Sequence, residues 1–202
     1  MARPYPSRRP NRRAQATRKR IMDAIRELLA EGVFHESTMD QVAERARIAR
    51  ATLYQHFRSR LDLVDAICET FDANPALLEL RDTVDLPDAE AALAATVAAS
   101  VRFWSSENAV LRQLYGAAAV DPAAHDLVAR QRSDRRGEIE RLVANLRRTK
   151  LLRPRLSPDR ALATLMVLTS YETFGELRAS GLSDRGVTTL LQEAARSLVG
   201  RD

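Results

Sequence analysis

The chain has 202 residues, of which 45% are hydrophobic, enough apolar material for one large domain or two small ones. No run of 18 apolar residues occurs, and the basic, polar first thirty residues lack the apolar centre of a secretory signal, so we expect neither a membrane span nor export. The single cysteine, Cys68, excludes an intramolecular disulfide and a cysteine-rich zinc site. These features predict a cytoplasmic protein.

Positive charge is concentrated at the N-terminal end. Residues 1–60 carry 14 Lys or Arg and 6 Asp or Glu, whereas residues 61–202 carry 18 and 21. This asymmetry favours an N-terminal end that faces nucleic acid and a body with another task, although a solvated basic tail would give the same pattern. Arginine outnumbers lysine 30 to 2, which we interpret as coding bias and not as evidence of phosphate recognition.

The first 62 residues predict an arm followed by three short helices. Residues 1–16 hold three prolines and five arginines with little aliphatic content, so we expect them to be disordered in isolation. Thr17 can cap a first helix, which should end near Gly32. Thr38 and Gln41 have the spacing of a capping box at the start of a second helix. After a break at 46–49, a third helix is expected over about 50–56.

The remaining chain also predicts helices. Ser59 can cap a fourth helix over about 60–80, which would link the first 62 residues to the body. Five more helices are expected at about 88–105, 107–119, 122–149, 157–179 and 183–199. No segment of useful length shows the alternation of a strand. The sequence therefore predicts an all-α protein of about nine helices.

The segment TMDQVAERARIARATLYQHFRSRLDL, residues 38–63, strongly resembles the DNA-binding signature of the tetracycline-repressor (TetR) family. The matching residues are Phe34, Thr38, Val42, Ala43, Ala46, Ile48, Thr52, Leu53, Tyr54, His56, Phe57, Ser59 and Leu63. The resemblance implies a helix-turn-helix domain at 17–62 and a helical effector-binding and dimerisation domain at 63–202. It implies a homodimeric regulator that binds a near-palindromic operator in duplex DNA. Arg47 departs from the family pattern, because it stands at the usual glycine of the turn.

The expected DNA contacts lie in and around the third helix, which should enter the major groove. Arg50 can donate two hydrogen bonds to a guanine, and Thr52 can touch a thymine methyl group. Tyr54 and His56 can donate to phosphates, unless they merely pack the domain. The full set of predicted DNA-binding residues is Arg12, Arg13, Thr38, Arg47, Arg50, Ala51, Thr52, Tyr54, His56 and Arg60. The arginines of the arm could instead reach a minor groove or only follow the backbone.

A dimer interface is expected on the last two helices, since one has a continuous apolar stripe and the other is apolar on nearly all sides. The candidate interface residues are Leu165, Val187, Leu190, Leu191, Ala194 and Leu198. The resemblance implies the same location. The alternative is an ordinary monomeric core.

A small-molecule effector, of unknown identity, is expected in the body. The candidate ligand-binding residues are Phe71, Trp104, Tyr115, Gln131, Asp134, Arg135, Glu138 and Tyr171. The aromatic members could equally be core residues, and the polar members could lie on an exposed turn. The histidines match no metal-ligand or nucleophile spacing, and no glycine-rich phosphate loop occurs, so we expect no enzyme, no metal and no cofactor. A ligand-independent architectural DNA-binding protein remains the alternative function.

Overall fold

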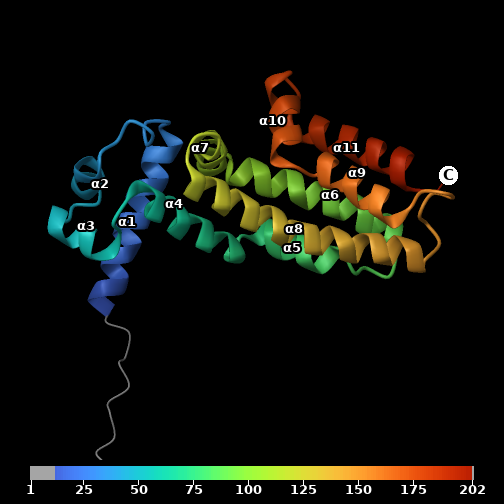
Figure 1. The fold of residues 1–202 in the computed structure, drawn as a ribbon, viewed down its shortest axis with the longest axis horizontal. Helices are drawn as coiled ribbons and strands as arrows, with labels where there is room; N and C mark the ends of the chain where they lie inside the picture. The colour runs from blue at the N-terminus through green and yellow to red at the C-terminus, as the bar shows by residue number, and fades with distance from the viewer. Residues whose placement is uncertain (1–11, 202) are drawn as a thin grey trace, which may run out of the picture. The chain divides into compact units, whose positions relative to one another are not determined.

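The computed structural model describes residues 12–201, and its regular elements are helices (Figure 1). An isolated β-bridge between Leu152 and Gly200 is the one strand-like pairing among these residues. The chain divides into two compact units, residues 1–69 and 70–202. The predicted all-α class is confirmed.

The N-terminal unit contains α1 (Arg12–Ala30), α2 (Met39–Arg45), α3 (Arg50–His56) and α4 (Arg60–Cys68). Its core forms because α1 buries one stripe, whose members recur every three or four residues. The side chains of this unit that are almost wholly buried include Ile21, Ile25, Leu29, Leu53, Leu63 and Ile67. Helices α2 and α4 pack directly on α1, and α3 packs on α2.

The first helix begins earlier than the sequence predicted. Residues 12–16, which we assigned to a disordered arm, belong to α1, and Thr17 lies inside the helix instead of capping it. The segment Arg12–Thr17 contains arginine, alanine and glutamine, which are strong helix formers, and these extend the helix beyond its buried stripe. The prediction for residues 1–11 lies outside the described residues.

The predicted continuous helix over 60–80 is wrong. The chain forms α4, then a 3₁₀ helix (Glu69–Ala73), then α5 (Pro75–Thr83). Asn74 starts α5, because its side chain accepts a hydrogen bond from the backbone N–H of Ala76. Pro75 lacks an N–H and occupies the first helical position, where a preceding helix cannot continue.

The C-terminal unit continues with α6 (Ala89–Ser106), α7 (Asn108–Ala118), α8 (Pro122–Arg148), α9 (Pro158–Leu168), α10 (Tyr171–Ala179) and α11 (Asp184–Val199). The predicted single helix over 157–179 is also wrong, because Ser170 accepts a hydrogen bond from the N–H of Thr173 and starts a new helix. The described residues therefore contain eleven α-helices, not about nine.

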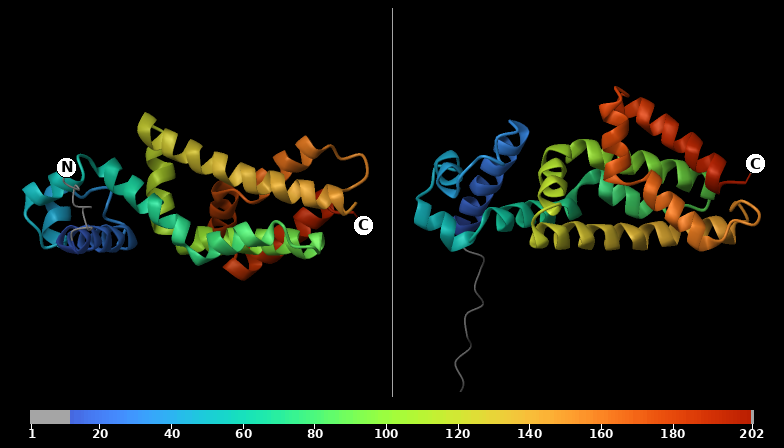
Figure 2. Two further views of the ribbon diagram at one scale, coloured as in Figure 1. Left: turned by 90° about the horizontal axis from the view of Figure 1, so that it is seen from below. Right: turned by 45° about the horizontal axis from the view of Figure 1, so that its top comes forward.

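Helix α6 lies at the centre of the C-terminal unit and packs against α5, α8 and α11, while α8 also contacts α7 and α9 (Figure 2). The largest fully buried side chains here are Leu111, Leu114, Ile139, Leu142, Leu146 and Leu165. No helix in residues 12–201 is long and apolar enough to cross a membrane.

Candidate nucleic-acid interface

The second helix is fixed at both its start and its inner face. The Thr38 hydroxyl accepts a hydrogen bond from the Gln41 N–H at 3.2 Å, and the Gln41 side chain accepts from the Thr38 N–H at 2.8 Å. The predicted capping box is therefore confirmed. Val42 and Ala43 bury the inner face of α2, and Leu53 does the same for α3. Since α3 is held by this one side, its other side is available to a partner.

The turn between α2 and α3 keeps the geometry that glycine would normally provide. Arg47 has a φ of 54°, in the left-handed region. This conformation costs a residue with a side chain about 1–2 kcal/mol. The Arg47 carbonyl accepts a hydrogen bond from Arg20 at 3.4 Å, and the Ile48 N–H donates to the Ala43 carbonyl at 3.0 Å. The non-glycine residue therefore strains the turn instead of reshaping it.

The outer face of α3 presents Arg50, Ala51 and Tyr54, all exposed. The Arg50 guanidinium donates to the Asp40 carboxylate at 2.9 Å, and its central carbon lies 5.4 Å from the centre of the Tyr54 ring. Arg50 is the first residue of α3. Its side chain is positioned by the carboxylate of Asp40 on α2 and by the ring of Tyr54, one turn later on α3. Asp40 was not among the predicted site residues, although its place in the first turn of α2 was predictable.

The other predicted contacts from α3 are less accessible. Thr52 and His56 are half-buried, and the His56 ring lies 6.3 Å from that of Phe57, which belongs to the core. Arg12 and Arg13 are exposed in the first turn of α1. On α3, Arg50, Ala51 and Tyr54 are therefore more accessible to a partner than Thr52 and His56.

Arg60, predicted to contact phosphate, is occupied within the domain. Its guanidinium donates to the carbonyls of His35 at 2.7 Å and Ser37 at 3.2 Å, and lies 5.7 Å from the centre of the Phe34 ring. It thus closes the loop that precedes α2. This structural use could not be found from the sequence, because the contacts join residues more than twenty positions apart.

The start of α4 is also satisfied internally. Asp62 accepts hydrogen bonds from the Ser59 hydroxyl and from the Arg58 N–H, each at 2.8 Å. These two bonds, the hydroxyl first, lower the pKa of the Asp62 carboxyl. A carboxylate therefore already lies where a phosphate at this helix N-terminus would bind.

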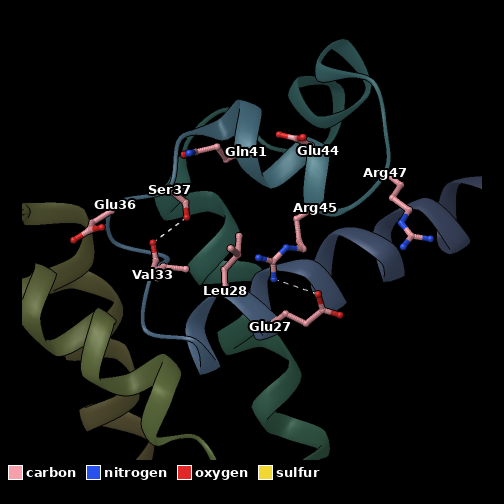
Figure 3. Close-up of a pocket in the computed structure, with 9 residues that line it drawn as sticks. All are labelled: Glu27, Leu28, Val33, Glu36, Ser37, Gln41, Glu44, Arg45 and Arg47. Atoms are coloured by element: carbon pink, nitrogen blue, oxygen red, sulfur yellow. Dashed lines mark hydrogen bonds and ion pairs between the residues drawn. The ribbon is translucent and has the colours of Figure 1, made fainter.

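A hollow of about 670 Å³ opens on another side of the N-terminal unit (Figure 3). Its lining residues are Glu27, Leu28, Val33, Glu36, Ser37, Gln41, Glu44, Arg45 and Arg47. Arg45 pairs with Glu31 at 2.8 Å and with Glu27 at 3.5 Å, and its hydrogen bond lowers the pKa of Glu31. Three glutamates line this hollow against two arginines, Arg45 and Arg47, so its charge does not favour a phosphate.

The predicted aromatic ligand residues do gather in one cluster of the C-terminal unit. Ring centres are separated by 5.3 Å for Phe71 and Phe103, 4.9 Å for Phe103 and Trp104, and 5.9 Å for Trp104 and Tyr171. Tyr115 joins through Tyr171 at 4.6 Å. Every member except Tyr115 is buried. We call these five residues the aromatic cluster.

The predicted polar ligand residues do not gather. Asp134 is exposed, and Glu138 pairs with Arg141 at 2.6 Å. Gln131 is half-buried, as is Arg135, which donates to the Met166 carbonyl at 2.9 Å and to the Thr169 hydroxyl at 3.0 Å. Of these four residues, only Arg135 donates hydrogen bonds to the segment between α9 and α10. In the same segment the Thr169 carbonyl accepts a hydrogen bond from the Trp104 indole N–H at 2.9 Å.

The predicted interface residues divide into two groups. Leu165, Val187 and Leu191 are buried within the single chain, so they are core residues and offer no surface to a partner. Their burial corrects the assignment of the whole α11 stripe to an interface. Leu190 and Leu198 are 43% and 48% exposed, and Ala194 is half-buried. Val167 on α9, which the sequence analysis missed, is 63% exposed.

Two short helices joined by a tight turn, with the second presenting an arginine and a tyrosine outward, define a helix-turn-helix DNA-binding domain. Residues 21–67 match the family model of "Bacterial regulatory proteins, tetR family", so this segment is a DNA-binding domain of that family's type. The resemblance of residues 38–63 to the TetR signature is therefore confirmed.

Curated relatives agree over the same region. The chain is 38% identical over 72 residues to the HTH-type transcriptional regulator UidR of Escherichia coli, a match that covers 36% of each chain. It is 39% identical over 74 residues to the HTH-type transcriptional regulator SrpR of Pseudomonas putida, covering 36% of this chain and 33% of that relative. The matches thus span about a third of these relatives.

Solved structures show that the fold is shared along nearly the whole chain. The SmeT–triclosan complex has a TM-score of 0.73 at 20% identity and covers 93% of each chain. A transcriptional regulator from Saccharomonospora viridis in complex with choline has a TM-score of 0.74 at 17% identity, covering 94% of this chain and all of that one.

Proposed function

We propose that this protein is a transcriptional regulator, most simply a repressor, that binds duplex DNA in the cytoplasm by inserting α3 into the major groove. The observation that carries the proposal is the outer face of α3, where Arg50, Ala51 and Tyr54 are exposed on a helix whose inner face is fixed by Leu53. An α-helix of this kind fits the groove, and its N-terminal residues reach base edges.

The contacts have distinct roles. Arg50 reads a guanine through two parallel hydrogen bonds, and Ala51 permits close approach because its side chain is small. Thr52 contacts a thymine methyl group. Tyr54 and His56 donate to phosphates, which fixes the register without reading sequence. Thr38, Arg47, Arg60, Arg12 and Arg13 remain proposed phosphate contacts, although Arg60 must first leave the two carbonyls that it binds.

The protein acts as a two-fold symmetric dimer on a near-palindromic operator. Val167, Leu190 and Leu198 are large apolar side chains exposed on α9 and α11 of one chain. Such side chains are removed from water when two copies pack together, which favours association. In a symmetric dimer the two recognition helices enter half-sites about 34–36 Å apart, or a multiple of that distance.

A small organic molecule that binds the C-terminal unit releases the DNA. The aromatic cluster supplies the apolar wall, and two proteins of the same fold were solved with triclosan and with choline. The connection to the DNA-binding unit runs along the chain through α4, the 3₁₀ helix and α5. A ligand that favours one arrangement of this connection changes the spacing of the recognition helices, at a coupling of about 1–3 kcal/mol.

Selection of bound duplexes from a random pool tests the proposal. We expect an enriched site with two inverted half-sites, each containing a guanine in the position that Arg50 reads. If the protein binds DNA at the chosen salt concentration but no sequence is enriched, the proposal of a regulator is contradicted, and an architectural DNA-binding protein is the function that remains. Enrichment of a single half-site would contradict the symmetric dimer.

A further inference from the structure

The aromatic cluster lies in a positively charged environment. The charged groups that act on the phenols of Tyr115 and Tyr171 are the guanidiniums of Arg112, Arg132 and Arg135 and the carboxylate of Glu172. Glu172 pairs with Arg132 at 3.1 Å. Arg112 is exposed, whereas Arg135 is half-buried. An ionic group removed from water is costly unless it is paired, so Arg135 is the charge of this set that needs explanation.

Arg135 is the central member of this environment. Its Nη1 makes two hydrogen bonds, to the Met166 carbonyl and the Thr169 hydroxyl, and both acceptors are neutral. Among the described residues Arg135 forms no ion pair, and its Nε and Nη2 donate no hydrogen bond. Burial lowers the pKa of this guanidinium, as expected for a charge removed from water without a compensating carboxylate.

The bonds that Arg135 makes have a structural role, because they satisfy carbonyl and hydroxyl groups at the C-terminal end of α9. That role uses only Nη1. The remaining edge of the guanidinium keeps the planar pair of N–H donors that matches a carboxylate. The hydrogen bonds of Nη1 hold the Arg135 side chain in place. They leave its Nε and Nη2 edge available to bind a ligand.

Two further polar groups lie near Arg135. The side-chain oxygen of Gln131, one turn earlier on α8, is buried and accepts no hydrogen bond from the described residues. Tyr115 is the one half-buried ring of the aromatic cluster, and burial raises its pKa to about 12, so its hydroxyl remains a donor at neutral pH. A ligand with a carboxylate and a polar hydrogen could satisfy all three groups.

We propose that Arg135 and the aromatic cluster form a binding site for an organic monoanion, a carboxylate attached to an aromatic or other flat apolar body. The carboxylate binds the Nε and Nη2 edge of Arg135, and the body packs against Tyr115, Tyr171 and Trp104 after Tyr115 rotates outward. A cationic ligand is disfavoured, because three guanidiniums and one carboxylate act on the phenols of Tyr115 and Tyr171. That this anion is the effector rests on the proposed function; the binding site itself does not.

The test compares three probes of one shape, naphthalene-2-carboxylate, its neutral amide and 2-naphthylmethylamine. Their binding to the full chain is followed by the emission of Trp104, the single tryptophan, and by calorimetry. We expect the carboxylate to bind at least tenfold more tightly than either other probe. Equal binding of the amide or the amine would overturn the proposal, and so would failure of the carboxylate to bind.

Arg135→Gln should lower the affinity for the carboxylate by about 10- to 100-fold and leave that for the amide nearly unchanged. Arg135→Lys should give an intermediate effect, because it keeps the charge without the planar pair of donors. The matched control is Arg136→Gln, the adjacent exposed arginine, which pairs with Glu140 at 2.8 Å. An equally weakened control would assign the effect to general surface charge and overturn the site.

The proposed function is tested separately from the site. If the carboxylate binds and Arg135→Gln abolishes the preference, but operator affinity does not change, the anion site stands and ligand-controlled release fails. If operator binding is found while no probe prefers the site, the regulator stands and the anion site fails. Should Arg135→Gln not fold, as judged by circular dichroism, the comparison of the three probes on the unaltered protein still decides.

Discussion

Replacement of Arg50 by alanine tests whether this residue reads a base, and the structure sets the expected magnitude. In the free protein Arg50 pairs with Asp40, but the two side chains are 66% and 53% exposed. An ion pair so open to solvent contributes at most about 1 kcal/mol. Two hydrogen bonds to a guanine discriminate by about 1–3 kcal/mol. The base contact is therefore the stronger one, and Arg50 can leave Asp40 to make it.

Arg50→Ala should accordingly weaken operator binding by about 1–3 kcal/mol, or roughly 5- to 150-fold. Binding to a scrambled duplex should fall much less, because only one positive charge is removed. The matched control is Asp40→Ala, which breaks the same ion pair but keeps Arg50. It should leave operator affinity unchanged or raise it, since a carboxylate that competes for the guanidinium is removed.

Fluorescence anisotropy with the selected and scrambled duplexes at one fixed salt concentration measures both variants. A repeated selection with Arg50→Ala should then show relaxed preference at one position in each half-site. If Asp40→Ala weakens binding as much as Arg50→Ala, the ion pair is what matters and the base contact is refuted. An unchanged sequence preference in Arg50→Ala would lead to the same conclusion.

Three further outcomes are expected. Arg47→Gly should raise the thermal unfolding midpoint by relieving the left-handed backbone at φ 54°, a gain of about 0.5–1 kcal/mol, and Arg47→Ala should not. Deletion of residues 1–11 removes three arginines and should reduce the slope of log affinity against log salt by about 0.9 for each phosphate that the protein no longer neutralises; an unchanged slope would make the arm a bystander. Leu190→Glu with Leu198→Glu should give monomers in sedimentation, whereas Leu78→Glu, an equally exposed leucine on α5, should leave the dimer intact.

The features that the sequence predicted well are those set by neighbouring residues. The Thr38 capping box and the Ser59 cap follow from spacings of three residues, and the structure contains both. The third helix over 50–56 was predicted with its observed bounds. Local chemistry of this kind also identified the family, whose model covers the same segment.

Features that depend on distant residues were not predictable in the same way. The division of the α11 stripe is one example. Leu190 and Leu191 are adjacent and equally apolar, yet one is 43% exposed and the other is 4% exposed. Which of them enters the core is decided by the helices that pack on α11, namely α6, α9 and α10. A stripe in the sequence shows that a face is apolar, but not whether the same chain or a partner covers it. For this reason the prediction of Leu191 as an interface residue is wrong, and a charge there would disrupt the fold itself.

The break between α9 and α10 is the clearest case, and it also explains how the anion site is built. The segment around Thr169 contains no proline or glycine, so the sequence favours one continuous helix. The break is instead supported from a distance: the Trp104 indole donates to the Thr169 carbonyl from 65 residues away, and Arg135 donates to the Met166 carbonyl from 31 residues away. A continuous helix would use those carbonyls for its own hydrogen bonds. Because α9 ends there, the Met166 carbonyl is free to accept a hydrogen bond from the Arg135 side chain, which is half-buried. Asp134, the preceding residue on α8, is exposed and cannot donate to a carbonyl when it is ionised.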